Sequence, residues 1–144
     1  MLHIHIVAAV TIALVGAGSG AAAPNEPGEA KLARALQDRT AGKPLDCLTL
    51  RYAQSSTVIE GTAIVFESAG TLYVNRPASG AESLSDLRTL FTRSLTGELC
   101  RGEPVGMVDT STGNETGGII LGQFVPYRKK APPVETHHVP ATGY

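Results

Sequence analysis

Four glutamates are the residues whose type and spacing could perform acid–base chemistry. Glu60 with Glu67, and Glu98 with Glu103, could act as paired carboxylates, with one group donating a proton and the other accepting one. Each of the four lies at or near an expected turn, where a carboxylate is ordinarily solvated. A small carboxylate-dependent hydrolase of the cell envelope is therefore the alternative function, and not the main expectation.

Histidine is missing from the part of the chain that we expect to fold, residues 29–127. The four histidines are His3, His5, His137 and His138. Ser–His and Cys–His catalysis and the common zinc sites therefore lack their usual group. His137 and His138 could bind a transition metal weakly, but a pair in a tail is ordinarily just solvated. We expect a protein that is not an enzyme and that uses no metal and no cofactor.

Asn75 and Arg76 are the candidate ligand-binding pair. They follow an apolar run and precede Pro77, so that Arg76 could bind an anion at a strand end. The same residues also serve simply to end a strand, because proline cannot donate to a β-ladder. The basic run at residues 128–130 could touch an anionic surface, or could only solvate a tail.

Cys47 and Cys100 are the two cysteines of the chain. In an oxidising compartment a lone pair is best explained by a disulfide. The bridge would close a loop of about 54 residues and stabilise the fold by about 4 kcal/mol. Two buried free thiols are the alternative. A redox couple, as in a disulfide-tuned stress protein of the envelope, is less expected because the spacing is not C-x-x-C.

Residues 1–23 have the layout of a secretory signal peptide, with an apolar run at residues 4–15 followed by small residues and no Asp, Glu, Lys or Arg. The apolar run is short for a membrane span, and an uncleaved anchor is the alternative. We therefore expect a periplasmic or secreted protein with no stable membrane insertion after cleavage. Because 12 Lys and Arg balance 13 Asp and Glu, no nucleic-acid partner is expected. An envelope protein is the expected partner class.

Short runs with a period of two predict a mainly β protein organised around a hairpin in residues 57–75. The hairpin turn contains Gly70, which can supply a positive φ. Residues 87–95 fit either a helix or a strand, and we favour a strand at 89–94. The other expected elements are a helix at 29–40, a strand at 45–52, a polar break at 54–56, a loop at 110–118 and a last strand at 119–125.

The predicted fold is a small antiparallel barrel or sandwich of about six to seven strands with one short N-terminal helix. The expected organisation is a signal peptide (1–23), a leader with the short helix (24–44), a β domain (45–127) and a disordered tail (128–144).

Several segments share a pattern with a known group of proteins. They are DCLTLR, IEGTAIVFESAGTLYVNRP, LTGELCRGEPV and FVPYR, and the matching residues are 47–51, 61–77, 96–102 and 124–128. This pattern resembles a family of small secreted bacterial proteins of unknown function. The resemblance covers about 80 residues. It implies export and a Cys47–Cys100 bridge, and it adds nothing about catalysis. With the features above, it predicts an exported, non-catalytic β-domain that acts as an interaction or small-ligand-binding module.

Overall fold

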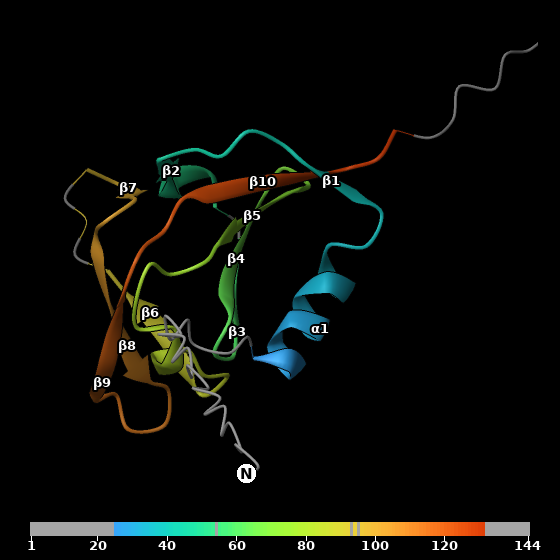
Figure 1. Ribbon diagram of the computed structural model, residues 1–144. Coiled ribbons are helices and arrows are strands. Elements are labelled where there is room, and N and C mark those ends of the chain that lie inside the picture. Colours follow the sequence, from blue (N-terminus) through green and yellow to red (C-terminus); the bar gives the residue numbers. More distant parts are fainter. Residues whose placement is uncertain (1–24, 54, 93, 95, 132–144) are drawn as a thin grey trace, which may run out of the picture.

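The computed structural model describes residues 25–53, 55–92, 94 and 96–131 (Figure 1). The expected signal peptide at 1–23, and residues 132–144 of the expected tail with both of its histidines, lie outside the described residues. The described residues form one α-helix, ten strands and two short 3-10 turns. The prediction of a mainly β fold with one short N-terminal helix is therefore confirmed.

A five-stranded antiparallel sheet lies at the centre of the molecule. In spatial order its strands are β1 (Arg39–Ala41), β10 (Phe124–Lys129), β5 (Thr71–Asn75), β4 (Ala63–Ser68) and β3 (Ser55–Ile59).

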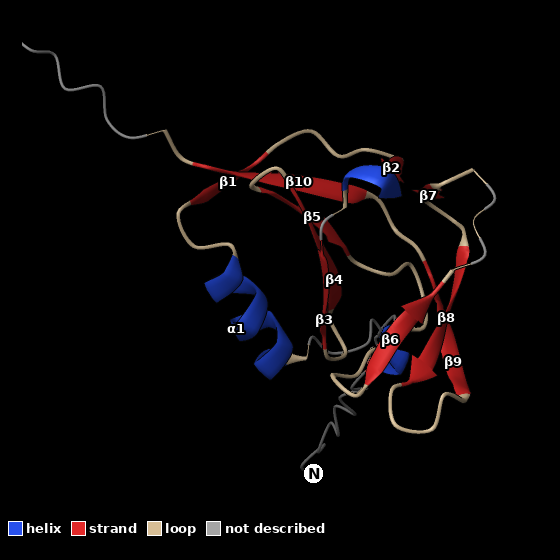
Figure 2. Ribbon diagram, turned by 180° about the vertical axis from the view of Figure 1, so that it is seen from behind, coloured by secondary structure: helices blue, strands red, loops and turns tan. Residues whose placement is uncertain are grey.

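Two smaller antiparallel sheets complete the β structure. One contains β6 (Arg88–Phe91), β8 (Pro104–Asp109) and β9 (Glu115–Ile120), and the other pairs β2 (Cys47–Thr49) with β7 (Glu98–Cys100). Figure 2 shows the single helix on one side of the central sheet and the three-stranded sheet on the other. The described strands form no closed barrel, because β3 pairs with β4 alone and β6 pairs with β8 alone. The sandwich form of the prediction is the one that fits.

The β4–β5 hairpin forms as predicted. Its turn consists of Ala69 and Gly70, whose φ values of 46° and 76° are those of the two-residue type I′ turn that matches strand twist. Residues 63–66 of β4 are continuously apolar because both faces of the strand are covered there. Ala63 and Val65 pack in the cluster that includes the helix residue Leu32, and Ile64 and Phe66 pack in the larger core on the other face.

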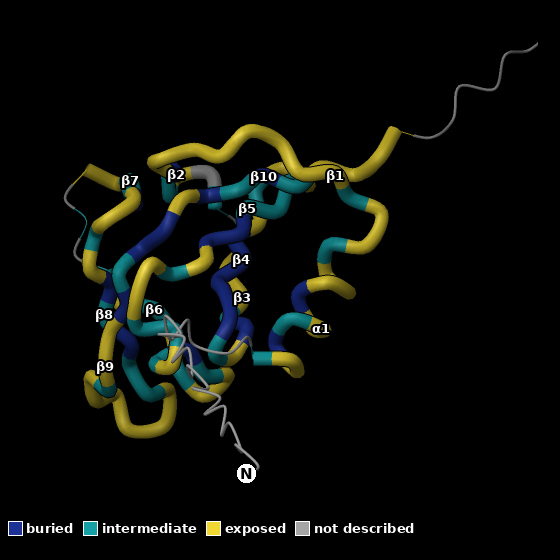
Figure 3. The backbone as a smooth tube through the Cα atoms, viewed as in Figure 1, coloured by how far each residue is buried: buried dark blue, intermediate teal, exposed yellow. Residues whose placement is uncertain are grey.

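The larger core fills the space between the central sheet and the two smaller sheets. The rings of Phe66 and Phe124 meet there with centroids 5.9 Å apart. Figure 3 shows this buried band running through β4, β8 and β10. The buried members of this core are Leu48, Ile64, Phe66, Leu84, Leu99, Val105, Met107, Ile119, Leu121 and Phe124.

The helix α1 (Glu26–Ala35) begins and ends earlier than predicted. Pro27 lies in its first turn, where a missing N–H costs nothing. The helix stops before residue 40 because Asp38 adopts a left-handed backbone with φ 58°, and the next three residues leave as β1 to pair with β10. The prediction of a helix at 29–40 is therefore wrong at both ends.

Two further boundaries at the C-terminal end differ from the predictions. The expected strand at 119–125 is two strands, since β9 ends at Ile120 and β10 begins at Phe124. Residues 121–123 form a corner that takes the chain from the three-stranded sheet to the central one. β10 then continues to Lys129, so Arg128 and Lys129 belong to the sheet and not to a tail.

Other strand predictions are corrected in the same way. The strand expected at 45–52 is shortened to β2 and followed by the 3-10 turn η1 (Leu50–Tyr52). Ser55 and Ser56, expected in a polar break, begin β3. Glu115 begins β9 inside the expected loop at 110–118. The strand preferred within 89–94 exists as β6, which confirms that choice over a helix.

Candidate functional site

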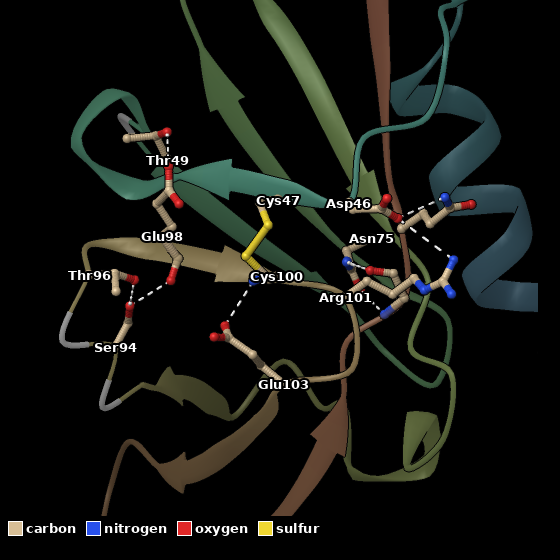
Figure 4. Close-up of a disulfide and its surroundings, with 12 residues drawn as sticks. Asp46, Cys47, Thr49, Asn75, Ser94, Thr96, Glu98, Cys100, Arg101 and Glu103 are labelled. Carbon is tan, nitrogen blue, oxygen red and sulfur yellow. Dashed lines mark hydrogen bonds and ion pairs between the residues drawn. A yellow bond between two sulfur atoms is a disulfide. The ribbon is translucent and has the colours of Figure 1, made fainter.

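The predicted disulfide between Cys47 and Cys100 is present (Figure 4). The two cysteines lie directly opposite each other in the β2–β7 ladder, and 53 positions separate them in the sequence. The backbone N–H of Cys100 donates to Oε2 of Glu103 at 2.8 Å. The bridge thus fastens a small sheet that covers one end of the larger core through Leu48 and Leu99.

Asn75, one member of the candidate ligand-binding pair, is fully buried. Its Nδ2 donates to the carbonyl of Gly122 at 2.8 Å, and the N–H of Gly122 donates to its Oδ1 at 3.1 Å. A Cβ at position 122 would collide with the carbonyl oxygen of Arg76, so this close approach requires glycine. Asn75 therefore ties the end of β5 to the corner at 121–123.

Arg76, the other member of the pair, forms a two-pronged ion pair with Glu29 of α1. Nη2 of Arg76 donates to Oε2 of Glu29 at 2.7 Å, and Nη1 donates to Oε1. The hydrogen bond from Arg76 lowers the pKa of Glu29, and the same bond raises the pKa of Arg76. Both candidate side chains thus have internal partners that an external ligand would have to displace. Their role in binding stays a prediction.

The predicted carboxylate pairs have separate surroundings. Glu60 lies in the turn after β3, whereas Glu67 lies at the far end of the same hairpin opposite Ser55. Oε1 of Glu98 accepts a hydrogen bond from the hydroxyl of Thr49 at 3.1 Å, and Glu103 accepts the bond from Cys100. Figure 4 shows these last two carboxylates beside the disulfide, each turned to its own partner. The four glutamates therefore do not form a pair in which one carboxyl group faces another as acid and base, as the hydrolase alternative would need.

We use the term closed seam for the junction formed by residues 45–47, 75–79, 100–103 and 120–124. Backbone hydrogen bonds cross it at several points, and the disulfide and the Asn75–Gly122 pair add to them. The backbone bonds run from Ala78 N to Ile120 O, from Arg101 N to Asp46 O, from Gly102 N to Leu121 O, from Leu121 N to Glu103 O and from Phe124 N to Leu45 O.

We use the term open seam for the place where the outer edges of β3 and β6 line one groove. Each strand has a single neighbour, so alternate N–H and C=O groups point away from its ladder. Within the described residues, 55–58 of β3 and 89–90 of β6 make no backbone hydrogen bond beyond those ladders. The groove has a volume of about 320 Å³. Its lining residues are Lys31, Ser56, Thr57, Val58, Asp86, Arg88, Thr89 and Leu90.

Two weak links cross the open seam. Nζ of Lys31 on α1 lies 3.2 Å from Oδ2 of Asp86, and their side chains are 46% and 54% exposed. The N–H of Gly61 donates to the carbonyl of Leu84 at 3.1 Å, at the β3–β4 turn. Such an exposed ion pair contributes little stability.

The open seam also carries apolar surface. Val58 and Leu90 are partly buried and pack against the larger core. Leu87, just before β6, is 70% exposed, and Phe91, at its end, is 43% exposed. Because side chains alternate along a strand, Phe91 lies on the same face of β6 as the exposed Thr89, and Leu87 lies in the turn just before the strand.

The sequence reasoning missed the open seam. Ser55 and Ser56 suggested a polar break, although the following Thr57, Val58 and Ile59 are β-branched residues that favour a strand. Val58 and Ile59 predict the beginning of a strand, and β3 extends that strand back to Ser55. No sequence signal showed that β3 and β6 would both lack a second neighbour, since this depends on how distant strands pair.

Asp109, which ends β8, has its carboxylate committed to its own loop. It accepts hydrogen bonds from the N–H groups of Ser111 and Thr112, both at 2.9 Å, and from their hydroxyls. These bonds, led by the Ser111 hydroxyl, lower the pKa of Asp109 to about 2. In the described part of the chain, no group of three or more His, Cys, Asp or Glu side chains is arranged to hold a metal ion.

Across the residues that the structure places, none of the helices has the length and apolar character needed to cross a membrane. In comparisons with known proteins, the chain matches no family model, no curated protein and no solved structure.

Proposed function

We propose that this protein is an exported, non-catalytic interaction module of the cell envelope that binds an extended segment of a partner protein along the open seam. One observation carries the proposal: the outer edges of β3 and β6 lack ladder partners and line the same groove. An extended peptide can supply the missing strand, because its own N–H and C=O groups match those of a sheet edge.

β3 lacks the features by which proteins protect an edge strand. Its five residues, Ser55–Ile59, include no charge and no proline, and they pair with β4 in unbroken register. The other edges of the two larger sheets differ. β1 has three residues, of which one is Arg39, and β9 is covered at its end by an antiparallel bridge between Ser79 and Ile120. Among the outer edges of the two larger sheets, β3 alone thus has no charge, no proline and no covering bridge, whereas β6, across the groove, carries Arg88.

The surroundings of the groove indicate the chemistry of the partner. Arg88 lines it and bonds to the carbonyl of Ser83 at 2.9 Å, and Lys31 is already paired with Asp86. Leu87, in the turn before β6, and Phe91, at the end of β6, are exposed apolar side chains. We therefore expect a partner segment with apolar or β-branched side chains at alternate positions and few charges.

Export is the second part of the proposal. A disulfide persists in the periplasm or outside the cell and is rare in the cytosol, and the Cys47–Cys100 bridge closes a long loop of a small domain. Residues 1–23 have the layout of a signal peptide. The resemblance to small secreted bacterial proteins points the same way. These three features together support a periplasmic or secreted location.

Site-specific cross-linking in the exporting cell tests the proposal. A photo-reactive residue at Thr57 on β3, or at Thr89 on β6, should form cross-links to one short segment of one partner. The matched control is Thr40, another exposed strand threonine, which lies on β1. Mass spectrometry then identifies the cross-linked segment and the mature N-terminus together.

A lysine scan sharpens the same test. Thr57→Lys adds a charge to the open edge and should abolish the cross-link from Thr89, whereas Thr40→Lys should leave it intact. The proposal fails if cross-links arise equally from Thr40 and Thr57, or if Thr57→Lys changes nothing. Turnover of a generic esterase, glycosidase or peptidase substrate at enzyme-like rates would contradict the proposal that the protein is non-catalytic.

A further inference from the structure

A second hollow, of about 490 Å³, lies beside β1, at the opposite edge of the central sheet from β3. Its walls come from the end of α1, the connection to β1 and the end of β10. Its lining residues are Ala35, Gln37, Asp38, Arg39, Lys129 and Lys130. With three cations and one carboxylate, the lining has a net charge of about +2.

The strand register forces two of these cations together. Arg39 of β1 and Lys129 of β10 are direct partners in the antiparallel ladder, so their side chains share one face of the sheet. Like charges directly opposite each other are destabilising. Within the described residues neither has a carboxylate at ion-pair distance, since the three ion pairs found there involve Lys31, Arg76 and Arg101. An anion between Arg39 and Lys129 would relieve their repulsion.

Arg39 is held in place by backbone carbonyls. Its Nη1 donates to Gly70 O at 2.7 Å and to Tyr127 O at 3.3 Å. The N–H of Lys130 donates to the carbonyl of Asp38 at 2.9 Å, which fixes the chain on the other side of the hollow. A guanidinium has five N–H donors, so Arg39 retains donors for a ligand in a fixed orientation.

We propose that this hollow binds a phosphate-type oxyanion. Arg39 supplies oriented donors that match phosphate oxygens, and Lys129 and Lys130 add two mobile point charges. The near-balanced charge of the whole chain conceals this site, because residues 128–130 gather three of its 12 cations beside β1.

Thermal unfolding with inorganic phosphate tests the site. At equal ionic strength, phosphate should raise the Tm of the wild-type protein by several degrees more than chloride does. Lys129→Gln should weaken phosphate binding about tenfold, because it removes one charged contact. The control is Lys43→Gln, which removes an exposed lysine that does not line the hollow. The proposal is overturned if phosphate and chloride raise the Tm equally. It is also overturned if phosphate raises the Tm of Lys129→Gln as much as that of the wild type.

Two sources could supply the phosphate group, a free phosphate or a phospholipid headgroup. Sedimentation with vesicles of phosphatidylglycerol in phosphatidylcholine separates them. If Lys129→Gln weakens both vesicle binding and the phosphate effect, the headgroup is bound at this site. If it weakens the phosphate effect alone, free phosphate is the ligand. Vesicle binding that does not depend on Lys129, without any phosphate effect, overturns the proposal.

Discussion

The two seams of this protein join the same layers by different means. The closed seam is crossed by a disulfide, a buried amide pair and several backbone hydrogen bonds. The open seam is crossed by one exposed ion pair and one backbone bond at a turn. The core beneath both is continuous, since Leu121 and Phe124 on one side and Val58 and Leu90 on the other pack in the same cluster.

This difference shows how a small domain can leave strand edges open and stay folded. The structure describes 104 residues, and a domain of that size buries a modest core. Covalent and buried polar contacts at the closed seam hold the layers together. The layers are therefore joined without a ladder between the outer edges of β3 and β6, which are the edges that bind the partner in the proposed function.

The largest change in the free energy of unfolding is expected when the disulfide is removed. Replacing both cysteines, with Cys47→Ser and Cys100→Ser together, should lower the free energy of unfolding by about 4 kcal/mol, because the unfolded chain regains the freedom of a long loop. Denaturant unfolding of the oxidised wild type and the double variant measures this.

The disulfide-free variant also tests the separation of the two seams. Cross-links from Thr57 should persist in it wherever it is folded, because the bridge lies outside the groove lining. A loss of less than about 1 kcal/mol would mean that the bridge does not constrain the unfolded state as a loop of this length should.

The next largest change in the free energy of unfolding is expected when Asn75 is replaced. Asn75→Ala leaves the buried N–H and C=O of Gly122 without their side-chain partner and should destabilise the fold by about 2–4 kcal/mol. The control is Asn114→Ala, an exposed asparagine on the loop before β9. Both variants are compared with the wild type by denaturant unfolding, and equal stability of the two variants would contradict the assigned role.

The sequence allowed the local features of the fold to be predicted. The β4–β5 hairpin follows from two short runs of apolar β-formers joined by a turn with Gly70. The disulfide follows from a lone cysteine pair in a chain whose first residues have the layout of a signal peptide. These features depend on residues near each other in the chain, or on composition alone. The mainly β fold class follows from the same short-period patterns.

The predictions that were wrong concern features that depend on pairing between distant segments of the chain. The helix gives way to β1 because β10 is available to pair with residues 39–41, and the run at 119–125 breaks because Asn75 binds Gly122 at its centre. A polar side chain at the end of a strand makes Asn75 a candidate ligand residue in the sequence. The same character suits it to hold a corner of the backbone, and local sequence does not distinguish the two uses.

The smallest changes in the free energy of unfolding are expected from two exposed ion pairs, one at each seam. Arg76 lowers the pKa of Glu29, so the native carboxylate stays ionised at a pH where the unfolded one is protonated. Its contribution to stability is therefore complete above the ordinary carboxyl pKa and is lost as the pH falls through the lowered native value. Because the side chains are 53% and 37% exposed, Glu29→Gln should cost under about 1 kcal/mol at neutral pH. Denaturant unfolding at a series of pH values should show this cost vanish in acid.

The matched change at the open seam is Lys31→Gln, which removes the ion pair with Asp86. Its cost should be near zero at neutral pH, because an ion pair between two half-exposed side chains is offset by the entropy lost in holding them and is screened by salt. A cost as large as that of Asn75→Ala would instead show that the open seam is fastened through Lys31. The edges of β3 and β6 would then be needed for folding, and their release to a partner would carry a stability penalty.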